Sequence, residues 1–473
     1  MLRTTAVCLV TLMLAGCNFG SKLVAPVEKS GELVVMTRYS PTTYFEDADG
    51  KLAGLEHDLV LLFAQDLNVR LRFVIAKQFS DIVPAVENHQ VNLAAAGLTI
   101  TDSRKNKVLF STPYQGVVEQ VAYNTDQARP RGIQDLIGKR IEVVAGSSYV
   151  DKLKEVRRMF PGLKWQEIPH QETEELLERL SLGETDYVLT DSHILTLSQN
   201  YYPNIAPAFD ISRSEYLAWA FPKRGSEWLR EKAKAFFARI QKDGTLKRLL
   251  DRYYGHIERL ERADVEGLLK KMNTTLPQYR DLFEQAQQLT GLDWRLLAAL
   301  GYQESHWEPL ATSPTGVRGL MMLTNDTADE YHVSDRLDPK QNIPAGAKYF
   351  RAMKDTVPAR IPEPDRTWIA LAAYNVGYGH VEDARVLAAK LKLNPDSWAD
   401  LKKTLPLLSK SQYFNTVKHG YARGGEPVIF VENIRTYFDI LAKFQKPNRE
   451  LFQVADKTAE QEAQGPIFSM PPM

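Results

Sequence analysis

The sequence predicts an α/β domain followed by a mainly α-helical domain. Up to about residue 256, short apolar runs of strand length alternate with segments of helical periodicity. This alternation stops after Gly255, and the rest of the chain consists of helical patterns separated by glycine and proline. A length of 473 residues agrees with two or three domains.

Composition and charge exclude several classes of site. Lys+Arg and Asp+Glu are 59 each, so the formal net charge is +0 and we expect no nucleic-acid partner. The only cysteines are Cys8 and Cys17, so the rest of the chain has no disulfide, thiol nucleophile or cysteine metal site. The 9 histidines form no HExxH pattern. We therefore predict neither a metal nor any other cofactor.

The first residues form a secretion signal. Arg3 precedes an apolar run over 6–14 that is too short to span a bilayer, which takes about 20 apolar residues. The run ends in Leu14-Ala15-Gly16-Cys17, which resembles the lipobox of bacterial lipoproteins. The resemblance implies a signal over 1–17, with Cys17 as the lipidated first mature residue. A plain secretory signal with an incidental cysteine is the alternative.

Residue 18 indicates to which membrane such a lipoprotein is transported. It is Asn rather than Asp, and by resemblance to Gram-negative lipoproteins this favours the outer membrane. Two or more acyl chains make a stable anchor. We expect the protein to be lipid-anchored at the periplasmic face of the outer membrane.

The first domain, assigned to residues 18–258, reads as two sets of strands and helices. The expected elements of the first set are strand 31–37, helix 55–67, strand 71–75, helix 82–87 and an apolar run over 91–96. Those of the second set are strand 140–145, a helix near 151–159 and strand 187–190. This order predicts a mostly parallel sheet.

Three segments of this domain resemble the periplasmic amino-acid-binding proteins of ABC transporters: Gly31–Val74, Gly97–Arg104 and Phe110–Tyr114. The resemblance implies two lobes that close on a ligand by a hinge. It also implies that Arg104 grips the ligand α-carboxylate, assisted by Thr99 and Ser148, and that Asp191 holds the α-amino group. A guanidinium suits this task because it donates two parallel hydrogen bonds. The alternative is a binding fold kept only as a scaffold.

The second domain, assigned to residues 259–450, is predicted to be helical. A charged stretch over 257–271 connects the two domains. An amphipathic helix over 279–289 has Pro277 near its first turn and ends at Gly291. Asp293 is placed to cap the next helix, which begins at Trp294.

Glu304 lies on the apolar face of that helix, four residues after Leu300 and seven after Leu297. Desolvation disfavours the charged carboxylate and raises its pKa. A carboxylic acid that is neutral near pH 7 can protonate a glycosidic oxygen. On these residues alone, a salt-bridged structural glutamate remains open.

Four motifs in this half resemble the lysozyme-like lytic transglycosylases, in that family's order: Glu304-Ser305, Gly316–Met322, Asp338–Gly346 and Ala372–Gly377. The resemblance implies that Glu304 is the catalytic acid/base for cleaving the β-1,4 bond between N-acetylmuramic acid and N-acetylglucosamine in peptidoglycan strands, with 1,6-anhydromuramoyl products. It implies substrate contacts for Ser305, Tyr374, Asn375 and Tyr437. Many relatives have glutamine where this chain has Met322, which puts one sugar contact in doubt.

The two halves together predict a peptidoglycan-cleaving enzyme whose first domain binds an amino acid or muropeptide effector. One alternative is a hydrolytic lysozyme, which uses water in place of the muramoyl C6 hydroxyl. The other is a non-catalytic receptor for solute or glycan. Residues 451–473 are polar and then rich in proline, and we expect them to form a flexible tail.

Overall fold

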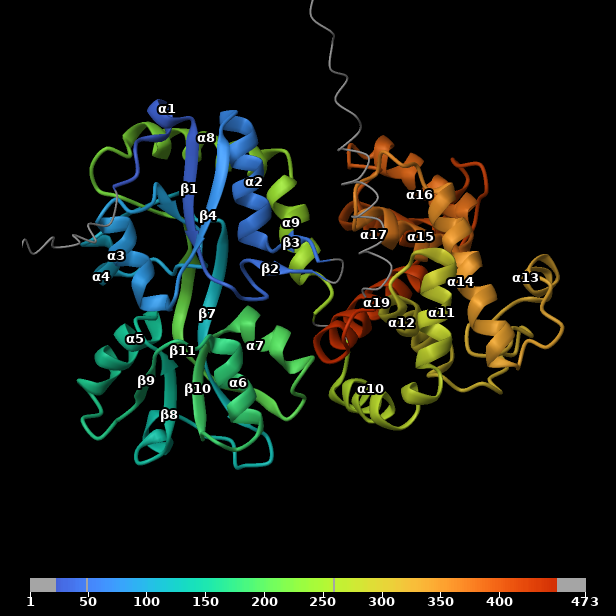
Figure 1. Ribbon diagram of the computed structural model, residues 1–473, viewed down its shortest axis with the longest axis horizontal. Coiled ribbons are helices and arrows are strands. Elements are labelled where there is room, and N and C mark those ends of the chain that lie inside the picture. Colours follow the sequence, from blue (N-terminus) through green and yellow to red (C-terminus); the bar gives the residue numbers. More distant parts are fainter. Residues whose placement is uncertain (1–22, 48–49, 258–259, 449–473) are drawn as a thin grey trace, which may run out of the picture.

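The computed structural model describes residues 23–47, 50–257 and 260–448, in which an α/β part of two lobes lies beside a helical part (Figure 1). Cys17 with its predicted signal over 1–17, and the predicted tail over 451–473, lie outside the described residues. Within the described ranges, no helix is both long enough and apolar enough to cross a membrane.

Lobe 1 is built on a five-stranded sheet of order β4-β1-β5-β12-β6. Its strands are β1 (Glu32–Thr37), β4 (Arg70–Ile75), β5 (Leu93–Ala94), β6 (Leu109–Phe110) and β12 (Ala220–Phe221), with a hairpin of β2 (Phe45–Glu46) and β3 (Leu52–Ala53). Its helices are α1 (Val27–Ser30), α2 (Leu55–Leu67), α3 (Ile82–Glu87), α4 (Asp102–Lys105), α8 (Glu227–Lys242) and α9 (Thr245–Tyr254). Leu33, Val34 and Val35 of β1 are fully buried, as a central strand covered on both faces requires.

Lobe 2 is built on a second five-stranded sheet, of order β11-β7-β10-β8-β9. Its strands are β7 (Gln115–Asn124), β8 (Ile141–Val144), β9 (Gln166–Ile168), β10 (Tyr187–Asp191) and β11 (Ile205–Leu217). Its helices are α5 (Ser148–Arg157), α6 (Thr173–Ser181) and α7 (Ser192–Gln199).

The prediction of a mostly parallel sheet is wrong, because both sheets are mixed. In lobe 1, β1 pairs in parallel with β4 and β5, whereas β12 pairs antiparallel with β5 and β6. In lobe 2, β7 pairs antiparallel with both β10 and β11. The chain enters lobe 2 along β7 and returns along β11, two long strands that run between the lobes (Figure 1). The antiparallel pairs come from these crossing strands in lobe 2 and from the short strand β12 in lobe 1, and none of the three was predicted from the sequence.

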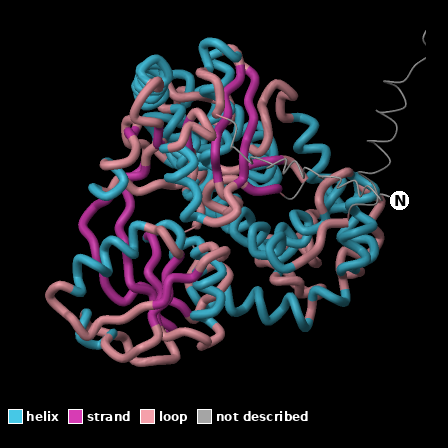
Figure 2. The backbone as a smooth tube through the Cα atoms, turned by 60° about the vertical axis from the view of Figure 1, so that its left-hand side comes forward, coloured by secondary structure: helices cyan, strands magenta, loops and turns pink. Residues whose placement is uncertain are grey.

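The helical domain follows the linker after α9. Its helices are α10 (Arg262–Thr274), α11 (Arg280–Thr290), α12 (Trp294–Ser305), α13 (Asn325–Glu330), α14 (Pro339–Thr356), α15 (Asp365–Val376), α16 (Tyr378–Lys390), α17 (Trp398–Thr404), α18 (Ser411–Phe414) and α19 (Gly425–Phe444). Helix α12 packs against α11 and α19, so it lies in the centre of the domain. Figure 2 shows the contrast between this helical part and the strand-rich lobes.

The helix boundaries before Glu304 follow the predicted signals with one exception. The Asp293 side chain accepts a hydrogen bond from the backbone N–H of Arg295, and Gly291 adopts the left-handed conformation that ends α11. Pro277, however, lies in a separate 3₁₀ turn over Leu276–Gln278, and α11 begins only at Arg280.

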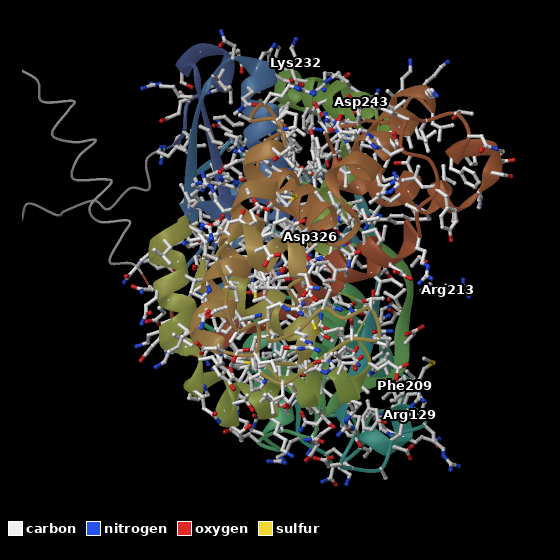
Figure 3. All side chains as sticks on the ribbon, turned by 90° about the vertical axis from the view of Figure 1, so that its right-hand side faces the viewer. Arg129, Phe209, Arg213, Lys232, Asp243 and Asp326 are labelled. Carbon is white, nitrogen blue, oxygen red and sulfur yellow. The ribbon has the colours of Figure 1, made fainter. Side chains whose placement is uncertain are left out.

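Both lobes contact the helical domain. From lobe 1, Asp251 of α9 pairs with Lys402 at 2.7 Å. From lobe 2, the ring of Tyr201 meets that of Phe444 edge-on, with centroids 6.4 Å apart. In Figure 3 the helical domain lies in front, with Lys232 of lobe 1 labelled above it and Arg129 of lobe 2 below.

Candidate active site and ligand cleft

Glu304 lies in the last turn of α12 with a half-buried side chain. Among the described residues, none forms a hydrogen bond or ion pair with its carboxyl group. Desolvation by burial is the cause that raises the pKa of Glu304 to about 8, which confirms the predicted direction. The group is therefore a carboxylic acid at neutral pH and can donate a proton.

A loop over residues 316–322 is tied to the end of α12 and to α15. The Ser305 hydroxyl donates to the backbone carbonyl of Leu320 at 2.9 Å, and the Tyr374 hydroxyl donates to that of Met321 at 2.9 Å. Burial, and next the charge of Glu304, raises the pKa of Tyr374 well above its ordinary value. Ser305 and Tyr374 thus hold the loop beside Glu304.

Asn342, on α14, also holds the loop over residues 316–322, and its side chain is fully buried. Its Oδ1 accepts from the backbone N–H of Met321 at 2.7 Å, and its Nδ2 donates to the carbonyls of Arg336 at 2.8 Å and Arg318 at 3.2 Å. Gly319 has φ +83°, and a Cβ there would lie 2.0 Å from the Arg336 carbonyl oxygen, so only glycine fits. Asn342 lies in one of the four sequence motifs, but its role could not be predicted, because its partners are known only from the tertiary structure.

The remaining predicted substrate residues lie in different surroundings. Asn375 is exposed at the end of α15 beside Tyr374. Tyr437 of α19 is only 4% exposed and packs edge-on against Tyr302, with ring centroids 4.9 Å apart. Sugar contacts by Ser305, Tyr374, Asn375 and Tyr437 stay predictions. Met322 is half-buried with φ +45°.

The four residues predicted to bind an amino acid lie where the lobes meet. Arg104 donates to the carbonyl of Thr99 in its own lobe at 2.8 Å and to that of Gly146 in lobe 2 at 3.2 Å. The hydroxyl of Ser148 lies 3.3 Å from that of Thr99. Among the described residues, the buried Oδ1 of Asp191 has no hydrogen-bond partner. Burial, and next the charge of Glu119, raises the pKa of Asp191 to about 7.

Two further charged residues of this cleft, Arg38 and Glu56, were not predicted from the sequence. Arg38, just after β1, is buried and pairs with Glu172 of lobe 2 at 2.5 Å. Glu56 of α2 is also buried. Each lies next to an apolar element and has partners far away in the sequence, so no local pattern marked them. Among the described residues, no group of His, Cys, Asp and Glu is arranged to hold a metal ion.

Two family models match the two parts of the chain. Residues 32–256 match the bacterial extracellular solute-binding proteins, family 3, and residues 281–395 match the transglycosylase SLT domain. Among solved structures, an ancestral arginine-binding protein bound to arginine is 29% identical, with a TM-score of 0.43, over 47% of this chain and 98% of that one.

Relatives that carry both parts are similar over nearly the full length. A membrane-bound lytic murein transglycosylase F of Methylobacillus flagellatus is 47% identical over 454 residues, which cover 95% of this chain and 96% of that protein. The protein of the same name from Nitrosospira multiformis is 49% identical over 435 residues, covering 92% and 91%. This chain therefore belongs to the membrane-bound lytic murein transglycosylase F family.

Proposed function

We propose that Glu304 is the acid/base with which this peptidoglycan lytic transglycosylase cleaves the β-1,4 bond between N-acetylmuramic acid and N-acetylglucosamine. One observation carries the proposal: a half-buried carboxyl group without a partner among the described residues, with its pKa raised to about 8 by desolvation. A structural glutamate at such a place would pair with a cation or with hydrogen-bond donors.

The mechanism uses one carboxyl group twice. Glu304 first protonates the glycosidic oxygen that leaves, and the N-acetyl group of the substrate meets the positive charge that develops at the sugar. The Glu304 carboxylate then removes the proton from the muramoyl C6 hydroxyl, which attacks the anomeric carbon and closes the 1,6-anhydro ring. Because both nucleophiles belong to the substrate, no second protein carboxylate is needed, in contrast to the usual glycosidase pair.

Mass spectrometry of products from purified peptidoglycan tests this proposal. The full chain in detergent should release anhydro-muropeptides, one water lighter than hydrolysed ones, and the Glu304→Gln variant should release none. Glu308→Gln is the matched control, because Glu308 is a neighbouring exposed glutamate paired with Lys271 at 2.9 Å. Hydrated reducing ends would instead make the protein a lysozyme, and no release by the wild type would favour the receptor alternative.

The cleft between the lobes is proposed to bind an amino acid or muropeptide effector. Arg104 offers a guanidinium whose bonds go only to backbone carbonyls among the described residues, and Asp191 offers a carboxylate oxygen without a partner there. These two groups complement the α-carboxylate and α-amino group of a zwitterion. Titration of muropeptides into the full chain should give binding that Arg104→Met removes. Arg72→Met, at an exposed site on β4, should leave it intact.

The lipid anchor is a separate proposal and rests on Leu14-Ala15-Gly16-Cys17 followed by Asn18. Cys17→Ser should move the protein from the membrane fraction to the soluble periplasm. Asn18→Asp should keep it membrane-bound but shift it from the outer to the inner membrane. Fractionation of cells expressing each variant measures both effects, and an unchanged distribution for Cys17→Ser would rule the anchor out.

A further inference from the structure

Two guanidinium groups share the cleft between the lobes. The guanidinium carbon of Arg38 lies 5.4 Å from the ring centre of Phe79, and that of Arg104 lies 5.5 Å from the same ring centre. Within the part of the chain that the structure describes, the Arg104 guanidinium donates only to the backbone carbonyls of Thr99 and Gly146. Arg38 instead donates to a carboxylate, that of Glu172 in lobe 2. Arg104 thus has no anionic partner among the described residues, whereas Arg38 is already paired with the Glu172 carboxylate.

The Arg38–Glu172 pair is unequal in burial. The side chain of Arg38 is 6% exposed and that of Glu172 is 21% exposed. Among the described residues, the guanidinium of Arg38 donates only one other hydrogen bond, to the carbonyl of Ala96 at 3.2 Å. A buried cation left without an anion is strongly destabilising, whereas a carboxylate at the rim of a cleft regains water when it is released. Arg38 therefore needs an anionic partner, but that partner need not be Glu172.

The closed cleft has no room for a ligand alongside this pair. The cavity lined by Arg38, Asp191 and Tyr254 has a volume of about 10 Å³, enough for about one water molecule. Ligand sites are usually about 300–1,000 Å³. A ligand can enter only when the lobes separate, and separation breaks the Arg38–Glu172 pair because the two residues belong to different lobes.

Of the other acids near Arg38, Asp191 is the proposed partner of the ligand α-amino group, whereas Glu56 and Glu174 accept hydrogen bonds from neutral donors. Glu56 accepts hydrogen bonds from the backbone of Gly97 and from the side chains of Tyr114 and Trp219. Glu174 accepts from the hydroxyl of Ser40 at 2.5 Å. Glu172 is the acid that combines partial exposure with an ion pair to Arg38, so it is the one that a ligand carboxylate can replace.

From this geometry we infer that the effector carries two carboxylates, of which one binds Arg104 and the other displaces Glu172 from Arg38. The ligand class is a small α-amino dicarboxylate. Glu172 is then an internal substitute for the ligand's second carboxylate and competes with it. This inference rests on the proposed effector site and specifies its ligand.

Calorimetric titration of the full chain in detergent with L-glutamate and L-glutamine tests the inference, since the two ligands are alike in size and differ in charge. The wild type should bind glutamate at least about tenfold tighter than glutamine, because a charge-assisted bond to a buried guanidinium is worth about that factor or more. Glu172→Gln weakens the internal competitor and should tighten glutamate binding by a further tenfold or so, with little change for glutamine. Glu175→Gln, on the exposed side of α6, should change neither affinity.

The charge preference itself should depend on Arg38. Arg38→Met should bind glutamate and glutamine equally, and Arg38→Lys should keep part of the preference. Circular dichroism checks that each variant folds; if Arg38→Met does not, Glu172→Gln and Arg38→Lys still decide the question. Equal binding of both ligands to the wild type, or no gain in Glu172→Gln, would overturn the inference. So would the absence of glutamate binding to both proteins, whereas the muropeptide titration reports separately on the effector site.

Discussion

Arg252, in the last turn of α9, donates to Asp365, the first residue of α15, at 2.8 Å, and this bond joins lobe 1 to the helical domain. The same guanidinium lies 3.4 Å from Asp58 of α2. The backbone carbonyl of Arg252 accepts from Arg435 of α19 at 2.7 Å. One residue thus connects two helices of the helical domain to lobe 1.

Arg252→Ala should loosen this connection. It leaves Asp58 and Asp365 without their shared cation, and their side chains are only 19% and 14% exposed. We expect a loss of about 1–3 kcal/mol in the free energy of unfolding, between the values for exposed and buried pairs. Scanning calorimetry should show the unfolding of the two parts at more widely separated temperatures. Arg224→Ala, at an exposed site in lobe 1, should leave the trace unchanged.

The pH dependence of cleavage should follow the protonation of Glu304. The acid form is the one that protonates the leaving oxygen, and the pKa of Glu304 is raised to about 8. The rate at low substrate, kcat/KM, should therefore fall as the pH rises through about 8. Initial rates of soluble muropeptide release between pH 6 and pH 10 measure this, and a fall centred near pH 4–5 would contradict the assignment.

The stability contributed by Glu304 should have the same sign of pH dependence. An unfolded glutamate has a pKa of about 4.3, so the folded protein holds this proton more tightly. The resulting stabilisation is fully present below about pH 4 and is lost as the pH rises towards about 8. Glu304→Gln should therefore gain stability relative to the wild type across this interval, by about 1 kcal/mol or more at pH 8. Urea unfolding at several pH values tests it, and a constant difference would refute it.

Asn342→Ala should disturb the loop beside Glu304. It removes the partner of the Met321 N–H and of the Arg318 and Arg336 carbonyls, and unsatisfied buried groups cost about 1–3 kcal/mol each. We expect a loss of about 2–4 kcal/mol in unfolding free energy and a larger proportional loss of activity than of folded protein. Asn273→Ala, which removes an exposed amide of α10, is the control.

Met322→Gln should improve substrate binding. The thioether of methionine cannot donate a hydrogen bond, whereas an amide can donate to a sugar hydroxyl or acetamide. The side chain is half-buried, so the stability should change by less than about 1 kcal/mol. A KM lowered a few-fold with kcat little changed is the expected result in muropeptide-release kinetics. An unchanged KM would mean that this position does not face the sugar.

Local patterns predicted the elements whose signals are local. Helix α2 has the predicted bounds, Leu55–Leu67, because its apolar residues recur with one helical period. The cap at Asp293 and the stop at Gly291 also follow from single residues with defined backbone preferences. The raised pKa of Glu304 followed from its spacing after Leu297 and Leu300.

Features that depend on distant partners were out of reach of the sequence. The crossing strands β7 and β11 pair residues about ninety positions apart, such as Val121 and Phe209. Arg38 and Glu172 are separated by 134 positions, so the sequence around either residue does not predict that they form an ion pair. Tyr437 follows a helical pattern that is equally consistent with a cleft and a core, and only the packing against Tyr302 places it in the interior.

Because the helical domain contacts both lobes, it also resists the opening of the ligand cleft between them. When the lobes rotate apart, a body that contacts both cannot follow both, so contacts such as the Asp251–Lys402 pair and the Tyr201–Phe444 contact come under strain. The work of opening therefore exceeds that of breaking the bonds between the lobes alone. A ligand that holds the lobes at a different angle would set a different tension on α19, the helix that runs past the buried centre of the helical domain.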